Sequence, residues 1–335
     1  MRRILIVLSL AILLLPAPPM GPPLIVRMGT LLVSARALPL SNSDPHLRRA
    51  GLLPYLDGWE LTSANPGFGG ISAMLIDPAG DILGLSDSGT LMGFHVGAGS
   101  AQRRPFLAPL PVRPQDRDEP WWVWDSEALT HDPATDRYWV GFELRQQICR
   151  YAPGFARVEA CRTWPDIMAW PKTGSIESLA RLADGRFLAI SEMGMTADGR
   201  HDALLFAGDP ADDRTAAPIH LRYAPPRGYR PTDAVALDAR HILVLNRRVT
   251  LQELFTATIA IVELPDRIEP GALLQARALA RLAPPLQADN FEGIAVTHER
   301  GQAAIWIISD DNHEFFQRSL LLKFALPSWV LKENH

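Results

Sequence analysis

At 335 residues, with 47% hydrophobic and 21% charged side chains, the chain is long enough to bury a sizeable core and is not composed like a disordered protein. Its formal net charge of -4 provides no basic footprint, which argues against nucleic-acid binding. The sequence also lacks a G-x-S-x-G motif, so nothing in it supports a serine hydrolase.

The N-terminus has the features of an export signal. Arg2 and Arg3 form a positive start, residues 4–15 are an apolar run, and Ala35-Arg36-Ala37 is a small-residue cleavage motif. The run is shorter than the ~20 apolar residues that a transmembrane helix needs. We therefore predict that residues 1–37 are a signal peptide and that the protein is periplasmic or secreted.

A second apolar stretch, residues 24–33, leaves an uncleaved N-terminal anchor open as the alternative. Such an anchor is the only membrane contact that we expect. Residues 38–54 are predicted to be a linker and residues 327–335 a C-terminal tail. The part between them, residues 55–326, is predicted to fold as one domain and to act as a monomer.

Five copies of one pattern make up most of this domain. Each copy has a small or acidic residue, an apolar stretch, a polar turn, a second apolar stretch and a further polar cluster. The turns are rich in Asp, Pro and Gly, and no run shows helical periodicity over the length that a helix needs. The copies recur about every 50–60 residues, with equivalent positions at Ser72, Glu127, Glu177, Asp233 and Glu292.

Two strands, usually followed by a third, that recur at this spacing are typical of a β-propeller blade. The predicted fold is therefore an all-β propeller of five blades, or of six if a degenerate unit lies around residues 90–120 or 200–230. The last copy has three strands before the chain ends. Residues 58–62 are expected to supply its fourth strand and to close the ring, which removes exposed sheet edges.

The two cysteines, Cys149 and Cys161, flank the turn signal Pro153-Gly154. A hairpin centred on Phe155 would place them opposite each other, at the ~4.5–5.5 Å Cβ separation of paired residues, slightly more than a disulfide needs. In an oxidising compartment this spacing favours a disulfide. The alternative is a pair of small packed thiols.

Acidic residues recur at two places in each copy, the start of the first strand and the end of the second. Because the two strands are antiparallel, both places lie at the same end of the hairpin, and hairpins wound about one axis bring them all to one mouth of the central channel. The acids predicted to meet there are Glu127, Glu143, Glu177, Glu192, Asp233, Glu292, Asp310 and Asp311. Asp87 joins them from the first copy, in which Ser72 replaces the acid.

Like charges this close together persist when a cation, an arginine or a bound proton compensates them. Oxygen ligands from several directions suit Ca²⁺, so the eight acids are predicted metal ligands and Ca²⁺ is the predicted cofactor. Four cationic side chains near the mouth are predicted to hold a small anionic ester substrate: Arg145, Lys172, Arg247 and His313. The alternative is structural, because acids at strand starts also cap loops and pair with arginines.

At this point the sequence resembles the phytase-like family, also described as esterase-like activity of phytase. The resemblance covers roughly residues 55–326 and is carried by four segments: Asp125-Ser126-Glu127-Ala128-Leu129, Gly174-Ser175-Ile176-Glu177-Ser178-Leu179, Asp289-Asn290-Phe291-Glu292-Gly293-Ile294 and Ser309-Asp310-Asp311-Asn312. It implies a secreted or periplasmic propeller that acts on phosphate or carboxylate esters, with Ca²⁺ and phosphate bound at the channel mouth. Ser72 and the lack of a dense Lys/Arg set depart from a phytate site, so phytate is not the expected substrate.

The leading prediction for function is a metal-dependent phosphoesterase or esterase. The metal would polarise the ester and lower the pKa of a bound water, and one acid of the ring, Glu127, Glu177 or Glu292, would act as general base. The alternative is a non-catalytic propeller that uses the same mouth to hold a ligand or a partner in the cell envelope.

Overall fold

The computed structural model describes residues 31–97, 101, 103–265, 267–299 and 301–331. Residues 1–30, the greater part of the predicted export signal, and residues 332–335 of the predicted tail lie outside this set. Signal peptide and anchor therefore both remain predictions. Within the described ranges, no helix is long and apolar enough to cross a membrane.

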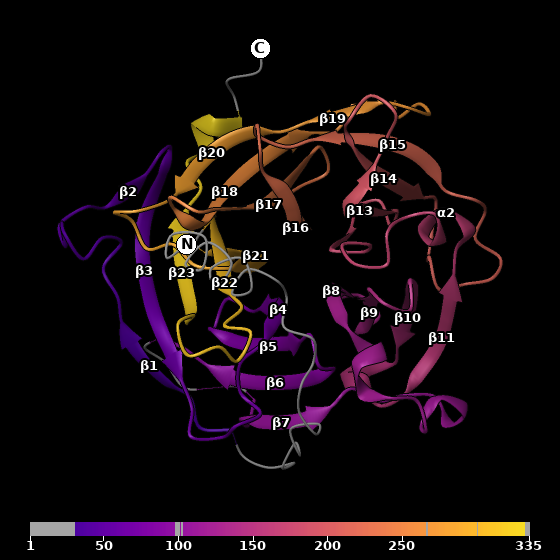
Figure 1. Cartoon of the computed structure of the whole chain (residues 1–335), viewed down its shortest axis with the longest axis horizontal. Coiled ribbons are helices and arrows are strands. Elements are labelled where there is room, and N and C mark those ends of the chain that lie inside the picture. The colour runs from indigo at the N-terminus through magenta and orange to yellow at the C-terminus, as the bar shows by residue number, and fades with distance from the viewer. Residues whose placement is uncertain (1–30, 98–100, 102, 266, 300, 332–335) are drawn as a thin grey trace, which may run out of the picture.

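Five β-sheets surround a common axis and form a five-bladed propeller (Figure 1). Blade 1 contains β4 (Ile71–Ile76), β5 (Asp81–Ser86), β6 (Thr90–His95) and β7 (Phe106–Pro109). Blade 2 contains β8 (Ser126–Asp132), β9 (Arg137–Phe142), β10 (Gln147–Tyr151) and β11 (Val158–Thr163). Blade 3 contains β12 (Ser178–Arg181), β13 (Phe187–Met195), β14 (His201–Phe206), β15 (Ile219–Ala224) and the parallel edge strand β19 (Leu273–Gln275).

Blade 4 contains β16 (Arg230–Ala236), β17 (His241–Thr250), β18 (Leu254–Glu263) and β20 (Arg277–Leu282). Blade 5 joins the two ends of the described chain: β21 (Phe291–Glu299), β22 (Gln302–Ser309) and β23 (Ser319–Ala325) are followed by β3 (Leu53–Thr62), which carries β1 (Ser34–Ala37) and β2 (Arg49–Ala50). Short helices connect strands, namely η1 (Pro114–Asp116), η2 (Trp121–Trp124), η3 (Pro153–Phe155) and α2 (Pro165–Met168), and η4 (Ser328–Leu331) follows the last strand.

The count of five blades and the closure by an N-terminal strand are both confirmed. The connections in which a sixth unit was possible contain β6, β7 and η1 in one case and β14 and β15 in the other, all of which belong to blades already counted or lead between them. The predicted closing residues 58–62 lie in β3, where Trp59 pairs with Leu321 of β23. A strand from the start of the chain therefore completes the last blade.

The hydrophobic core is divided into five clusters, one at each interface between neighbouring blades. Every blade is covered on both faces, so its middle strands are largely buried; all six residues of β5, for example, are buried. The innermost strands β4, β8, β12, β16 and β21 contact one another in turn around the axis. This packing fixes the positions of the residues that precede and follow each innermost strand.

The segment predicted to be a linker is instead part of the folded domain. Leu38 and Leu40 are buried in the core between blades 4 and 5, and β2 pairs with β3. The predicted cleavage motif 35–37 lies in β1, and Leu31 before it is 1% exposed. Cleavage after Ala37 would remove this edge strand, whereas cleavage before Leu31, or retention of an anchor, would preserve it.

Cys149 and Cys161 are joined by a disulfide across the outer hairpin of blade 2. They are direct partners in the register of β10 and β11, and the turn between them contains Phe155 in η3. The hairpin geometry expected from the sequence is therefore present, and the free-thiol alternative is not.

Candidate functional site

The first acidic position of the repeat coincides with an irregularity in the innermost strands. β4, β8 and β21 each contain a β-bulge, whose extra residues are Ser72, Glu127 and Glu292. A bulge leaves one residue outside the ladder and turns its side chain away from the regular alternation. In blade 3, Glu177 immediately precedes β12 and needs no bulge.

The second position lies just after the second strand in blades 1, 2 and 5 and within the longer second strands β13 and β17 of blades 3 and 4. The backbone N–H groups of Asp87, Glu143 and Asp310 donate equivalent hydrogen bonds to the carbonyl groups of the residues that begin each innermost hairpin, Gly70, Asp125 and Asn290. Glu192 and Arg247 occupy the corresponding places in blades 3 and 4. Both positions therefore lie at one end of the ring, which we call the acidic end.

Eight carboxyl groups at this end interact with one another and form what we call the acidic cluster: Asp87, Asp125, Glu127, Glu143, Glu177, Glu192, Glu292 and Asp310. The interactions run between blades as well as within them. Glu127 of blade 2 is repelled by Glu177 of blade 3 and by Glu292 of blade 5, and Asp310 of blade 5 is repelled by Asp87 of blade 1. Residues far apart in sequence thus share one electrostatic environment.

Burial and mutual repulsion keep protons on this cluster. Burial, followed by repulsion from Asp125, raises the pKa of Asp87 to about 7, and burial, opposed by a hydrogen bond with Glu127, raises the pKa of Asp125 to about 7. Burial also raises the pKa values of Glu127 and Glu177 well above the usual range. Carboxyl groups of both protonation states are therefore present near neutral pH.

Arg247 provides the positive charge inside the cluster. Its guanidinium forms an ion pair with Glu292, lies 3.1 Å from Glu192 Oε1 and donates a 2.6 Å hydrogen bond to Asn290 Oδ1. Although burial opposes the charged form, Glu292, Glu192 and Glu177 together raise the pKa of Arg247. The guanidinium is thus held by the protein's own acids, instead of standing ready for a substrate anion.

A loop of blade 5 brings His313 over the start of blade 1. A Cβ atom on Gly70, whose φ is +62°, would lie 2.9 Å from Asp87 Oδ1 and 3.1 Å from His313 Nε2, so only glycine leaves room here. The Asp311 carboxylate fixes this loop by accepting hydrogen bonds from Gly70 N (2.9 Å), His313 N (3.1 Å) and Ser319 Oγ (2.8 Å). Asp311 therefore anchors the loop, and His313 reaches the cluster beside Asp87.

Asp233, like the loop anchor Asp311, is a predicted metal ligand that the structure places outside the acidic cluster. The bulge of β16 falls at Thr232, one residue earlier than the repeat alignment assumed, so Thr232 is the equivalent of Glu127 and Glu292. The Asp233 carboxylate instead accepts hydrogen bonds from Ala234 N (2.7 Å) and Ile294 N (2.8 Å). It links blade 4 to blade 5.

Two predicted substrate-binding cations lie outside the cluster. Arg145 is 3.4 Å from Asp116 and 3.8 Å from Glu119, and its guanidinium stacks 4.3 Å from the ring centroid of Trp124. Lys172 is exposed in the connection before Gly174. Within the described residues, neither side chain forms a hydrogen bond or an ion pair with the acidic cluster.

Sequence reasoning missed Asp125, Asn290 and the role of Ser72. Asp125 and Asn290 occupy matching positions two residues before the bulged glutamates, a repeat signal that was available. The sequence marks Ser72 only as a position without the expected acid. In the structure Ser72 is 1% exposed, and its hydroxyl has no hydrogen-bond partner among the described residues. A buried hydroxyl left unpaired costs free energy, so we include Ser72 among the candidate site residues.

The eight sequence-predicted calcium ligands do not form a cation site as arranged. Within the described residues, no three His, Cys, Asp or Glu side chains are arranged to hold a metal ion. Six of the predicted ligands already accept hydrogen bonds from protein donors: Asp233 and Asp311 as described above, Glu143 from Gly174 N, Asp310 from Asn312 N, and Glu192 and Glu292 from Arg247. The donor chemistry of these acids suits Ca²⁺, and Ca²⁺ binding stays a prediction; we assign no chemical step to a metal.

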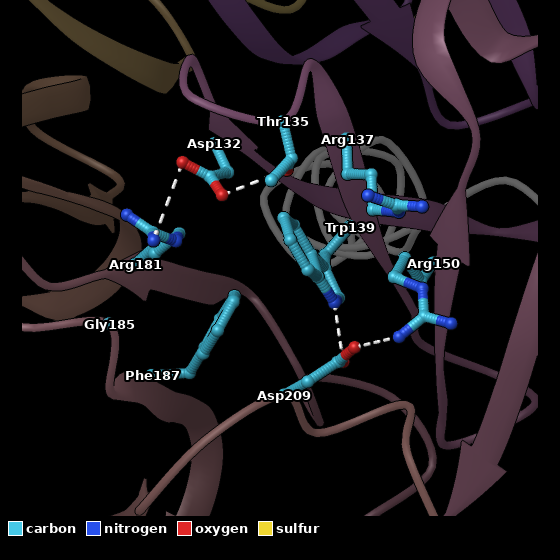
Figure 2. A pocket seen from close by; sticks show the side chains of 9 residues that line it. All are labelled: Asp132, Thr135, Arg137, Trp139, Arg150, Arg181, Gly185, Phe187 and Asp209. Atoms are coloured by element: carbon cyan, nitrogen blue, oxygen red, sulfur yellow. Dashed lines mark hydrogen bonds and ion pairs between the residues drawn. The ribbon is translucent and has the colours of Figure 1, made fainter.

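A separate pocket of about 310 Å³ lies at the opposite end of blades 2 and 3 (Figure 2). Its arginines are paired: Arg181 lies 3.4 Å from Asp132, and Arg150 forms an ion pair with Asp209, which also accepts a 2.6 Å hydrogen bond from Trp139 Nε1. Arg137 donates to Glu159 at 2.7 Å. Because acids of the protein neutralise these arginines, the pocket is better explained as an ion-paired contact between blades.

Fold and site together define a five-bladed β-propeller with a buried acidic cluster at one end of its axis. The family model described as phytase-like, esterase-like activity of phytase, matches residues 66–313. The chain belongs to this phytase-like family. The matched segment contains every member of the acidic cluster, together with Ser72, Arg247 and His313.

The solved structures that resemble this chain in backbone path are only distantly similar to it in sequence. The β-propeller domain of Cps50 (Swd1) from Myceliophteria thermophila is 9% identical, with 89% of this chain and 99% of that chain covered and a TM-score of 0.41. The WD40 repeats of RRP9 are 9% identical, with 76% and 81% covered and a TM-score of 0.39. Hydrazine synthase of Kuenenia stuttgartiensis is 13% identical, with 72% and 77% covered and a TM-score of 0.38. No curated protein matches the sequence.

Proposed function

We propose that this protein is an exported ester hydrolase whose reaction takes place at the acidic cluster. The observation that carries the proposal is the convergence of carboxyl groups from blades 1, 2, 3 and 5, with Ser72 at the equivalent bulge of blade 1. Membership of a family described by esterase-like activity supports the same reaction class. The disulfide supports export, because disulfides persist in oxidising compartments.

The chemistry needs a group that accepts a proton from water and another that donates one to the leaving group. A carboxyl group with a pKa near 7 serves both purposes at neutral pH, and burial gives Asp87 and Asp125 such values. In the proposed mechanism, ionised Asp87 accepts the proton of the attacking water, with His313 close to it. Protonated Asp125 donates to the departing alcohol oxygen.

The glutamates predicted as catalytic have a different role in this mechanism. Glu127 and Glu177 are buried and keep their protons, so they act as hydrogen-bond donors to the oxygen that becomes negative during attack on the ester. Neutral carboxylic acids in apolar surroundings can stabilise an oxyanion in this way. Glu292 positions Arg247 instead, because its carboxylate is paired with that guanidinium.

Hydrolysis of p-nitrophenyl acetate and p-nitrophenyl phosphate at pH 7 tests the proposal. Each ester is measured with added Ca²⁺ and with chelator, for the wild type, Glu177→Gln and Asp87→Asn. Both substitutions should lower kcat at least ~100-fold, the range of a general acid–base or oxyanion contribution. Glu269→Gln, on an exposed side chain outside the cluster, is the matched control and should not change kcat.

Absence of hydrolysis under every condition would remove the enzyme and leave the non-catalytic binding propeller. Activity that is abolished by chelator and restored by Ca²⁺ would show that side chains rearrange around a cation, and would replace the metal-free assignment of roles given above.

A further inference from the structure

Large apolar side chains are exposed around the acidic end of the ring. They lie at the connections between the second and third strands of blades 3, 4 and 5, which follow directly after Glu192, Arg247 and Asp310. We call them the apolar rim: Met195, Val249, Leu251, Leu254, Phe315 and Phe316. Phe315 is 95% exposed and Leu251 is 63% exposed, values that are unusual for side chains of this size.

The apolar rim is built on ordered structure. β17 and β18 continue their pairing beyond Arg247, with Val249 opposite Phe255 and Thr250 opposite Leu254, so the hairpin projects past the cluster. A strand rises ~3.3 Å per residue, which places its tip about 10 Å beyond Arg247.

The loop that carries the two phenylalanines is also fixed. Its backbone is held by bonds from Glu314 N to Asp311 O (2.7 Å) and from Gln317 N to Glu314 O (3.1 Å), and the rings of Phe315 and Phe316 meet edge to face at 5.3 Å. Both rings therefore remain exposed even though the loop is anchored. Such a cluster of exposed apolar groups marks a binding surface.

Charge at the acidic end disfavours an anionic substrate. Among the described residues, Arg247 is the arginine that forms ion pairs within the acidic cluster. Its guanidinium is already paired with Glu192 and Glu292. Arg145 is paired with Asp116 and Glu119. A phosphate or carboxylate group entering the cluster would meet carboxyl groups that already repel one another. The charge distribution therefore favours an uncharged ester over the anionic ester that we predicted from the sequence.

We propose that the substrates are uncharged carboxylate esters with an apolar acyl chain. The ester group enters the acidic cluster beside the unpaired hydroxyl of Ser72, and the acyl chain lies along the apolar rim. The proposal rests on the proposed hydrolase function and adds the class of substrate.

Hydrolysis of p-nitrophenyl acetate, butanoate and hexanoate tests the proposal, with p-nitrophenyl phosphate as the anionic comparison. In the wild type, kcat/KM should rise at least tenfold from acetate to hexanoate, and the phosphate should be the poorest substrate. The combined variant Leu251→Ser, Phe315→Ser and Phe316→Ser should lose this rise, so that hexanoate is hydrolysed with no higher kcat/KM than acetate. Leu56→Ser, an exposed leucine on β3 toward the other end of blade 5, is the control and should keep the rise.

Equal kcat/KM values for the three chain lengths, or faster hydrolysis of the phosphate than of every carboxylate ester, would overturn the proposal. Binding of the wild type but not the triple variant to phosphatidylcholine vesicles, without a chain-length preference, would also overturn it and identify the rim as a membrane contact.

A binding measurement separates failure of the substrate class from failure of the proposed function. The probe is 2-octanone, an uncharged ketone that cannot be hydrolysed, titrated by calorimetry. Binding that weakens at least tenfold in the triple variant, in a protein that hydrolyses no ester, would retain the substrate class and remove the hydrolase. No binding to the wild type would remove the substrate class.

Discussion

The surroundings of Arg247 make the stability of the fold depend on its positive charge. The side chain lies among Glu192, Glu292 and Asn290, and its charge offsets part of the repulsion within the acidic cluster. A buried ion pair contributes little net stability compared with an apolar replacement of both partners, but loss of one partner leaves the other buried and uncompensated. The position should therefore be sensitive to substitution.

Arg247→Met should lower the free energy of unfolding by about 3–5 kcal/mol at pH 8, because Glu192 and Glu292 would lose their counter-charge. Chemical denaturation monitored by tryptophan fluorescence measures the change. The matched control is Arg186→Met, which removes a surface pair with Asp184 at 2.7 Å and should cost no more than about 1 kcal/mol. Equal losses for the two variants would show that Arg247 does not neutralise the cluster.

The raised pKa values of Asp87 and Asp125 predict that stability falls as pH rises. In the unfolded chain these groups lose their protons near pH ~3.9, whereas in the folded protein they keep them to about pH 7. Between these values the folded state binds more protons, so each group should lower the free energy of unfolding by about 1.4 kcal/mol per pH unit. This contribution is complete below pH ~4 and lost by about pH 7.

The comparison of wild type with Asp87→Asn isolates this effect from other titrations. The wild type should lose more stability than Asp87→Asn between pH 5 and pH 7, measured by denaturant unfolding at each pH. Asp184→Asn, on an exposed carboxylate, should follow the wild type. A wild type and Asp87→Asn with parallel pH profiles would contradict burial of the Asp87 carboxyl.

At the scale of elements, the innermost strands determine which acids reach the cluster. Strand alternation and the repeat spacing were sufficient to predict Glu127, Glu177, Glu192 and Glu292, because two antiparallel strands bring their ends together wherever the repeat recurs. They were insufficient for blade 4, where the bulge lies at Thr232 and shifts Asp233 out of the set. A one-residue shift reverses the face of every following side chain, and no local sequence signal indicates it.

Asp233 should therefore behave as a structural residue. Asp233→Ala removes the acceptor for Ala234 N and Ile294 N and should lower the free energy of unfolding by about 1–3 kcal/mol, the cost of unpaired buried donors. Ester hydrolysis at a temperature where the variant is folded should remain within about twofold of the wild type. A loss of kcat comparable to that of Glu177→Gln would return Asp233 to the site.

At the scale of the whole molecule, the ring is completed by a strand that comes from the other end of the sequence. The expectation of closure came from counting strands: the last repeat had three, and the chain before the first repeat had a spare one. The parallel strand β19, which passes from the connection after β18 to the edge of blade 3, was not foreseen, because three residues carry too little pattern to identify a strand.

Removal of residues 1–62 should prevent formation of a stable monomer. The deletion takes away β3 and exposes the edge of β23 as well as the core of blade 5, and such an edge pairs with other chains. Size-exclusion chromatography should show aggregates. A monomeric protein with normal thermal unfolding after deletion of residues 1–62 would contradict closure by β3.

The central claim is that carboxyl groups from four blades form one interacting cluster. Side-chain carbon NMR of labelled glutamate, recorded as a function of pH, tests it directly when the wild type is compared with Glu292→Gln. We predict that removal of this blade 5 charge lowers the pKa of Glu127 in blade 2 and of Glu177 in blade 3, because Glu292 repels both. Unchanged titration of both glutamates would contradict the cluster and the site built on it.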